Sequence, residues 1–195
     1  MSERKDSGKE TAVAYLRKYT PETFERKNAI EAELIPRGFE GMALETEALR
    51  ILALEDLGPS EELVSHNALV DVGRALWSDL LIGAGGTTYT NAVSALGVGD
   101  SAAAYAAGQT NLQGAVVTTD RIRKAMDATF PSRAANVVTW RATFATTEAN
   151  FIWNEWAIFN NVTDASGTML NRAVVNLGTK TSAAAWQLTV TTTLT

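Results

Sequence analysis

Two glycine-rich stretches have the residue types of phosphate-binding loops. Gly97-Val98-Gly99-Asp100 follows a short alternating segment, and Gly83-Ala84-Gly85-Gly86 follows a strongly periodic one. A phosphate loop needs a lysine or a further glycine at a defined spacing, because an ammonium and backbone N–H groups hold the anion. Neither stretch provides this. We therefore predict that Gly97, Gly99 and Asp100 form a structural turn, and that residues 83–86 end a helix.

Carboxylates are the second candidate for chemistry. Glu148 lies in a segment with turn composition, and Glu155 lies between two tryptophans. Two carboxylates that face each other across a cleft can hydrolyse a glycosidic bond. The other interpretation is structural, with Glu155 as a strand residue bonded to Arg141 or Arg172. We favour the structural interpretation, because spacing alone does not bring the two glutamates together.

Metal and nucleophile chemistry is restricted by composition. The sequence has no cysteine and one histidine, His66. Thiolate sites, multi-histidine metal sites and mechanisms with two imidazoles are therefore excluded. His66 lies off the apolar stripe of a predicted helix, where we expect a solvated side chain. We predict no catalytic residue, no metal ligand and no cofactor, and hence no enzyme.

Charge and hydropathy also restrict the partners. Hydrophobic residues make up 46 % of the sequence, which predicts a folded chain, and the net charge is −5. Nucleic-acid binding proteins usually carry a basic surplus. No apolar run approaches the roughly 20 residues of a membrane span, and the charged first ten residues are unlike a secretory signal. We expect production in the cytoplasm, with neither a nucleic-acid nor a membrane partner.

The distribution of charge predicts two parts. Residues 1–62 hold 9 Lys or Arg and 14 Asp or Glu, whereas residues 63–195 hold 8 and 8. We predict a charged N-terminal arm over residues 1–62 and a helix plus an antiparallel β-domain over residues 63–195.

Helical periodicity dominates the first 82 residues. We expect helices over residues 9–19, from Pro21 to about Leu34 with Thr20 as the N-cap, and along an apolar pattern that ends near Leu57. The strongest helical pattern covers residues 63–82. Shorter helical segments are expected within residues 102–112 and near residues 122–126.

Alternation with a period of two dominates the rest of the sequence. Residues 93–98, 136–145, 153–160, 168–177 and the C-terminal segment each predict a strand, and short turns link most of them. The strand at 153–160 has large residues on both faces, which predicts a central position. The predicted fold class is α+β: a mainly antiparallel β-sandwich-like body over residues ~92–195, a preceding helix and a partly helical arm.

Aromatic and aliphatic residues on alternating strand positions define the expected core. Thr and Gln alternate with them in the last strand, which is typical of an outer sheet face. The other interpretation of the aromatic residues is an exposed binding platform. The predicted core residues are Trp140, Phe144, Trp156, Ile158, Trp186, Leu188 and Val190.

Five stretches of the second part occur in a distinctive order. They are "ALGVGDSAAAYAAGQTNLQG", "RKAMDATFP", "VVTWRATFATTEANFIWNEWAIFNN", "GTMLNRAVVNLGTK" and "WQLTVTTTLT". Together they make residues 79–195 similar to a domain of tailed-bacteriophage virion structural proteins, including tail-fibre and tail-collar segments. The resemblance implies a structural β-domain and supplies no catalytic residue.

The resemblance implies a non-enzymatic role in a virion that is assembled in the host cytoplasm. The expectation we favour is a minor capsid or decoration protein, homo-oligomeric, that binds the major capsid protein or other virion proteins and stabilises the lattice. A tail, baseplate or fibre-anchor protein is one alternative. A host-surface glycan-binding adhesin, with loops 87–91 and 160–167 exposed, is the other.

Overall fold

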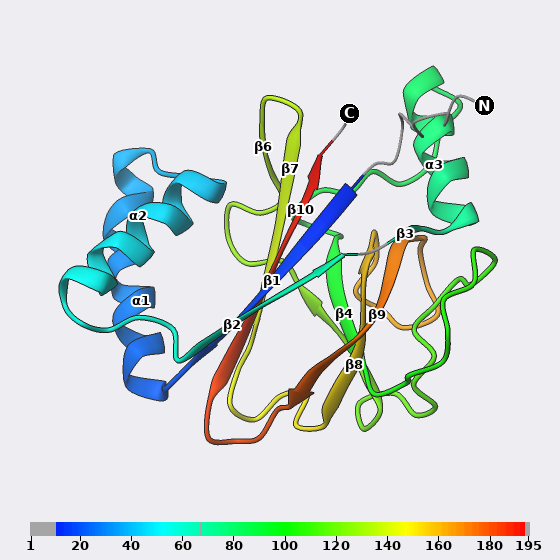
Figure 1. Cartoon of the computed structure of the whole chain (residues 1–195). Helices are drawn as coiled ribbons and strands as arrows, with labels where there is room; N and C mark the ends of the chain where they lie inside the picture. The colour runs from blue at the N-terminus through cyan, green and yellow to red at the C-terminus, as the bar shows by residue number, and fades with distance from the viewer. Residues whose placement is uncertain (1–10, 67, 194–195) are drawn as a thin grey trace, which may run out of the picture.

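Two β-sheets face each other, and helices lie beside them (Figure 1). The computed structural model describes residues 11–66 and 68–193, and this part contains two five-stranded sheets with antiparallel strand pairs. Sheet A has the order β2-β1-β10-β7-β6, and sheet B has the order β3-β9-β8-β4-β5. The strands are β1 (Thr11–Tyr19), β2 (Glu61–His66), β3 (Ala68–Leu69), β4 (Ala95–Gly99), β5 (Arg121–Ala125), β6 (Ser132–Ala134), β7 (Val137–Phe144), β8 (Ile152–Phe159), β9 (Met169–Thr179) and β10 (Ala185–Thr193).

In the described part of the chain, three α-helices flank the sheets. Helices α1 (Pro21–Leu34) and α2 (Gly41–Leu54) are joined by the short 3-10 helix η1 (Ile35–Arg37) and lie on the outer side of sheet A (Figure 1). Helix α3 (Asp71–Ile82) lies against β9. Gly73 allows this approach, because a Cβ there would lie 2.2 Å from the carbonyl oxygen of Leu170. No helix of the described residues has the length and apolarity needed to span a membrane.

The main core lies between the sheets, where both inner faces contribute side chains. All seven residues that were predicted as core lie in one buried cluster. Rings within it meet edge to face: the Trp153 ring centroid lies 4.8 Å from that of Phe144 and 4.9 Å from that of Trp186. Such geometry is favourable for aromatic pairs. A second, smaller apolar cluster joins α1, α2 and Tyr19.

Several predicted elements are confirmed. Helix α1 begins after Thr20, whose side chain accepts a hydrogen bond from the Thr23 N–H, and it ends at Leu34. Strands β7 and β10 match the alternating segments, and β8 is the central strand of sheet B. Two antiparallel sheets with helices agree with the predicted α+β, mainly sandwich-like class.

The helix expected over residues 9–19 is wrong. The described residues of this segment form β1, which pairs with β10 on one side and β2 on the other. Ala14 and Leu16 face the main core, whereas Arg17 and Tyr19 face the helices. The apolar spacing was compatible with both structures, and pairing with two strands decided between them. The predicted boundary at residue 62 falls inside β2.

The helix expected over residues 63–82 is only half correct. Its first part is β2 and β3, and the helix proper begins at Asp71. Gly83 ends it in the left-handed conformation, with a φ of 72°. Residues 102–112 contain no helix, and the segment near residues 122–126 is β5 rather than a helical turn. In β5 the chain pairs with β4, which overrides the local helical spacing.

Candidate functional site

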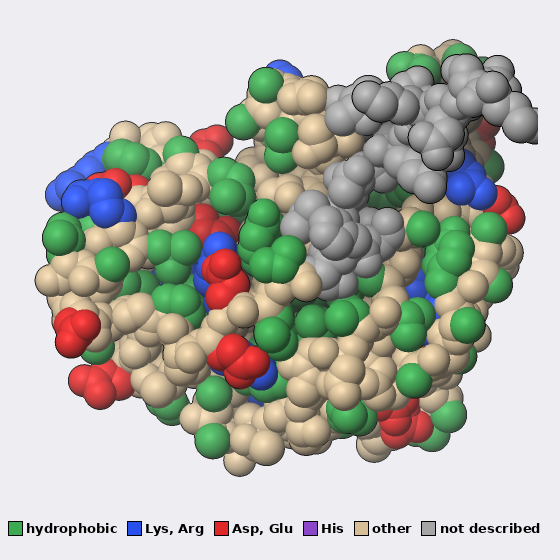
Figure 2. Space-filling view, in the orientation of Figure 1, with side chains coloured by type: hydrophobic (Ala, Val, Ile, Leu, Met, Phe, Trp, Pro, Cys, Tyr) green, Lys and Arg blue, Asp and Glu red, His purple; other side chains and the backbone are tan. Residues whose placement is uncertain are grey.

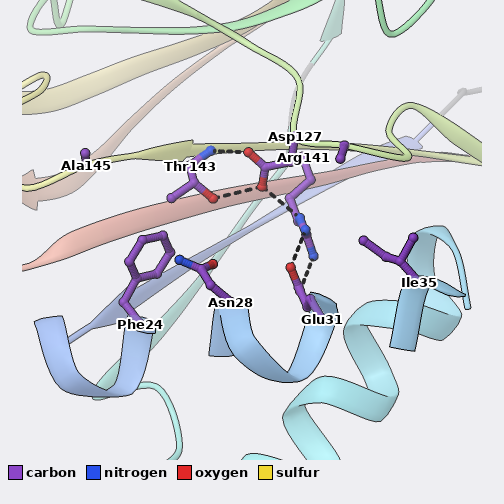
Figure 3. A pocket seen from close by; sticks show the side chains of 9 residues that line it. Phe24, Asn28, Glu31, Ile35, Asp127, Arg141, Thr143 and Ala145 are labelled. Carbon is purple, nitrogen blue, oxygen red and sulfur yellow. Dashed lines mark hydrogen bonds and ion pairs between the residues drawn. The ribbon is translucent and has the colours of Figure 1, made fainter. Parts of the chain in front are cut away.

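A layer of charged side chains lies between sheet A and the helices α1 and α2. Arg141, on β7, is at its centre: Nη1 and Nη2 donate to the two oxygens of Glu31 at 2.7 and 2.8 Å. Its Nε donates to Asp127 at 2.9 Å (Figure 3). Cζ also lies 4.3 Å from the centre of the Phe130 ring. The guanidinium thus joins α1 to the sheet by a bidentate pair, the strongest form of ion pair.

Helix α1 contributes two charged residues to this layer, Lys27 and Glu31, which lie one turn apart on its buried face. Lys27 is fully buried and donates to Glu31, four residues later. Burial lowers the pKa of Lys27. For Glu31, burial raises the pKa, but Lys27 and Arg141 outweigh it and hold the value below 4.5. Glu31 is therefore a permanent anion at neutral pH.

Helix α2 contributes a second buried carboxylate to the layer. Glu45 accepts a hydrogen bond from Arg17 of β1, and the Thr189 hydroxyl donates to Glu45 at 3.1 Å. Arg17 Nε also donates to Glu62 of β2 at 2.6 Å. Burial, with Glu45 nearby, raises the pKa of Tyr19. Four elements of the fold are tied together here by charged groups.

The polar face of β10 was predicted to face outward, but the charged layer covers it, together with the polar face of β7. Thr139, Arg141, Gln187 and Thr189 are buried. Polar side chains are tolerated in the layer because most of their donors and acceptors are paired. Two atoms of the layer, the Tyr19 hydroxyl and Gln187 Oε1, are buried without a partner among the described residues.

An open pocket borders the layer between α1 and β7, with a volume of about 350 Å³ (Figure 3). Phe24 and Ile35 form apolar walls, and Asp127 lies at its inner side. The Asp127 carboxylate already accepts bonds from Arg141 and from both the N–H and the hydroxyl of Thr143. The carboxylates that reach the pocket are thus engaged with donors, which suits a structural role better than proton transfer.

A further buried ion pair lies in sheet B, apart from the charged layer. Glu155 of β8 accepts from Nε of Arg172 at 2.6 Å, and both side chains are 0 % exposed. Glu155 also accepts from the backbone N–H groups of Gln113 and Gly114 at 2.8 Å. Arg172 donates to the side chain of Gln109 at 2.9 Å. The pair therefore anchors the long connection between β4 and β5.

Of the two partners expected for Glu155, the structure places Arg172 beside it. Arg141 lies instead in the charged layer on the other sheet. Glu148 pairs with Lys124 at 2.5 Å and accepts from the Ala145 N–H. The two glutamates have separate partners, and Glu155 is sealed from solvent, so the geometry of a glycosidase pair is not observed at these residues.

The turn predicted at Gly97, Gly99 and Asp100 is wrong for the two glycines. Gly97 and Gly99 belong to β4, and Asp100 follows the strand. These glycines make room for neighbouring side chains: a Cβ on Gly99 would lie 2.4 Å from Oε1 of Glu155, and one on Gly97 would lie 2.8 Å from Phe159. Burial and the nearby Asp120 raise the pKa of Asp100. The glycines thus serve packing across strands.

The loops considered for glycan binding use their amides internally. Asn160 donates to the carbonyl of Thr87 at 2.7 Å, and its own oxygen accepts from the Thr168 N–H. Asn91 donates to the carbonyls of Asp127 and Phe130. The aromatic residues predicted as core are buried, as the 5 % exposure of Trp140 illustrates, so they do not form the alternative exposed platform.

The backbone of His66 lies in β2, so the predicted helical position is wrong, and its side chain lies outside the described part. Within the described residues, no group of three or more potential ligands could hold a metal ion. Sequence reasoning missed Arg17, Lys27 and Glu45 as buried groups. The four-residue spacing from Glu31 could have indicated Lys27, whereas Arg17 and Glu45 meet across 28 residues of sequence and have no such local signal.

Comparisons of the chain with protein-family models, with curated proteins and with solved structures found no match.

Proposed function

We propose that this protein is a non-enzymatic structural component of a tailed-phage virion, and that it acts as a minor capsid or decoration protein. The observation that supports a non-enzymatic role is that the charged side chains that could act in catalysis are paired with one another inside the protein. Arg141 and Glu31, and likewise Arg172 and Glu155, bind each other in buried positions. Groups engaged in this way hold a scaffold together and are poor acids, bases or nucleophiles.

The surface supports a role in protein association. Leu81 and Ile82, at the end of α3, are 79 % and 77 % exposed, and Val116 and Val117 project from the connection between β4 and β5. Figure 2 shows hydrophobic side chains dispersed among polar ones, with acidic and basic groups close together. A mixed surface of this kind fits contact with other proteins better than contact with nucleic acid.

The location in a virion is supported by the sequence resemblance of residues 79–195. Many copies of a rigid domain that bind only the assembled lattice would stabilise it by mass action. Such copies are expected to form a symmetric oligomer. The major capsid protein is the partner we propose.

The number of copies per purified particle tests this proposal. Quantitative staining against the major capsid protein should give a copy number of the same order as that protein. About a dozen copies or fewer would place the protein in the tail or neck and reject the decoration role. No copies in the particle would reject the virion role altogether.

A further inference from the structure

One lysine outside the charged layer has an unusual environment. Lys180 lies in the turn between β9 and β10 and is 1 % exposed. Its Nζ lies 2.7 Å from the carbonyl oxygen of Ala145 and 2.8 Å from Oδ1 of Asn150, and its third contact, with Thr181 O, is longer at 3.5 Å. Lys27, which is also fully buried, is by contrast paired with Glu31. Lys180 has only neutral oxygens as hydrogen-bond partners among the described residues.

This environment favours an uncharged amine. Burial lowers the pKa of Lys180 to about 8, and the charge of Glu148 opposes the shift only in part. A substantial fraction of the side chain is therefore neutral at mildly alkaline pH. A neutral amine has the free electron pair of a nucleophile, and burial is one of the ways in which proteins activate lysine.

The group next to the amine is a carboxamide held at both ends. Asn150 Oδ1 contacts Nζ of Lys180, and Nδ2 of Asn150 donates to the carbonyl of Thr146 at 2.8 Å. The carboxamide is thus held in place, with its oxygen 2.8 Å from the nitrogen of Lys180. Fixed proximity of this kind raises the rate of otherwise slow reactions by several orders of magnitude. Asn150 is exposed, so a small leaving group can reach solvent.

A carboxylate completes the cluster. Oε2 of Glu148 accepts from the N–H of Ala145 at 2.8 Å, and the carbonyl of the same residue accepts from Lys180. Lys124 and the Ala145 N–H contribute to a pKa of Glu148 below its usual value, although burial acts in the opposite direction. Glu148 is therefore ionised, and its negative charge acts on Lys180 without a direct contact between the two side chains.

We propose that the side chains of Lys180 and Asn150 join in an intramolecular isopeptide bond, with the charge of Glu148 stabilising the positive charge that develops on Nζ. The electron pair of the neutral Nζ attacks Cγ of Asn150, and an N–C bond forms. The Cγ–Nδ2 bond then breaks. The proton lost from Nζ passes through solvent, which reaches the exposed Asn150, to Nδ2, and Nδ2 leaves as ammonia. An amine and a primary amide thus give a secondary amide without any oxidant or reductant.

The bond would fasten the sandwich at one end. Asn150 lies in the turn between β7 of sheet A and β8 of sheet B, and Lys180 lies in the turn between β9 of sheet B and β10 of sheet A. Both turns lie at the lower end of Figure 1, and the Lys180 N–H donates to the carbonyl of Phe151 at 3.0 Å. A covalent link there joins two connections between the sheets. This inference does not depend on the proposed virion role.

Mass spectrometry of the full-length protein tests the bond directly. After incubation at pH 8.5, the intact mass should be about 17 Da below the mass of the sequence, because one ammonia is lost. Trypsin cleaves after Arg141 and Arg172 but not after an acylated Lys180. The digest should therefore contain residues 142–172 joined to residues 173–195 as one branched peptide.

Succinimide formation at an asparagine also releases ammonia, and a control variant separates the two reactions. In Lys180→Arg the loss of mass should disappear, whereas a succinimide would still form in that variant. Glu148→Gln keeps both reacting groups and should form the bond at least tenfold more slowly. A wild-type protein that is folded by circular dichroism and keeps its full mass at pH 8.5 would overturn the proposal. A mass loss that persists in Lys180→Arg would overturn it as well.

Discussion

The buried pair of Glu155 and Arg172 allows a sharp test of what holds the connection between β4 and β5. We consider Glu155→Gln, which preserves the shape of the side chain and removes its charge. Arg172 then stays 1 % exposed as a whole residue without a counter-charge. In the wild type, Gln113 N–H, Gly114 N–H and Arg172 all donate to Glu155. The amide group introduced by Glu155→Gln would turn an N–H donor toward one of these donors, which leaves both without an acceptor.

The expected cost follows from the uncompensated charge. Removing one partner of a buried ion pair typically costs about 3–5 kcal/mol, which is a large part of the ~5–15 kcal/mol that stabilises a domain. Replacing both partners in Glu155→Met/Arg172→Met leaves no charge behind. The double variant should therefore be less destabilised than the sum of the single variants predicts.

Guanidinium unfolding followed by tryptophan fluorescence measures these free energies, since Trp153 and Trp156 flank Glu155. Hydrogen exchange of the Gln113 and Gly114 amides reports on the connection itself and should accelerate in Glu155→Gln. The matched control is Glu47→Gln, which removes a surface pair with Arg50 and should change stability little. A cost below about 1 kcal/mol, with unchanged exchange of the two amides, would refute the anchoring role.

Three further predictions concern the core, the strand glycines and pH. Trp140→Ala should lower the free energy of unfolding by about 3–5 kcal/mol, measured by denaturant titration, and a cost under ~1 kcal/mol would contradict a core position. Gly99→Ala should lower the melting temperature because the new Cβ would collide with Glu155. Gly108 has open space around it, so Gly108→Ala should leave the melting temperature unchanged. Equal melting temperatures of the two variants would contradict the packing argument. The pKa of Glu31 is lower in the folded state than its unfolded value of 4.5, so its stabilising effect is complete above pH 4.5 and is lost as pH falls through the folded value. Glu31→Gln should therefore lose less stability than the wild type between about pH 6 and pH 3, as measured by urea titrations. An unaltered pH profile would contradict this prediction.

Much of the β-structure could be predicted because its signals are local. Alternation of large apolar residues with Thr and Arg in residues 137–144 and 185–193 reflects the two faces of a strand, and burial of one face follows from hydropathy. The N-cap Thr20 followed by proline likewise marked the beginning of α1 correctly. Each of these signals involves neighbours within a few residues.

The same reasoning failed where small or widely spaced apolar residues fit both periods. Residues 11–19 form a strand because β10, at the other end of the chain, pairs with them along their whole length. Gly97 and Gly99 have the composition of a turn, but they belong to a strand because Phe159 and Glu155 need the space above them. Contacts distant in sequence outweighed local preference in both cases.

The sequence alone determined which residues could fill a core between two sheets and narrowed the partner of Glu155 to two arginines. Only the tertiary structure decided that Arg172 pairs with Glu155 and that Arg141 pairs with Glu31, which is 110 residues away in sequence. The physical reason is that a polar strand face has the same pattern whether water or a charged helix covers it. The strand order and the placement of α1 and α2 determine which faces are covered and which charges meet. No local sequence pattern encodes either of them.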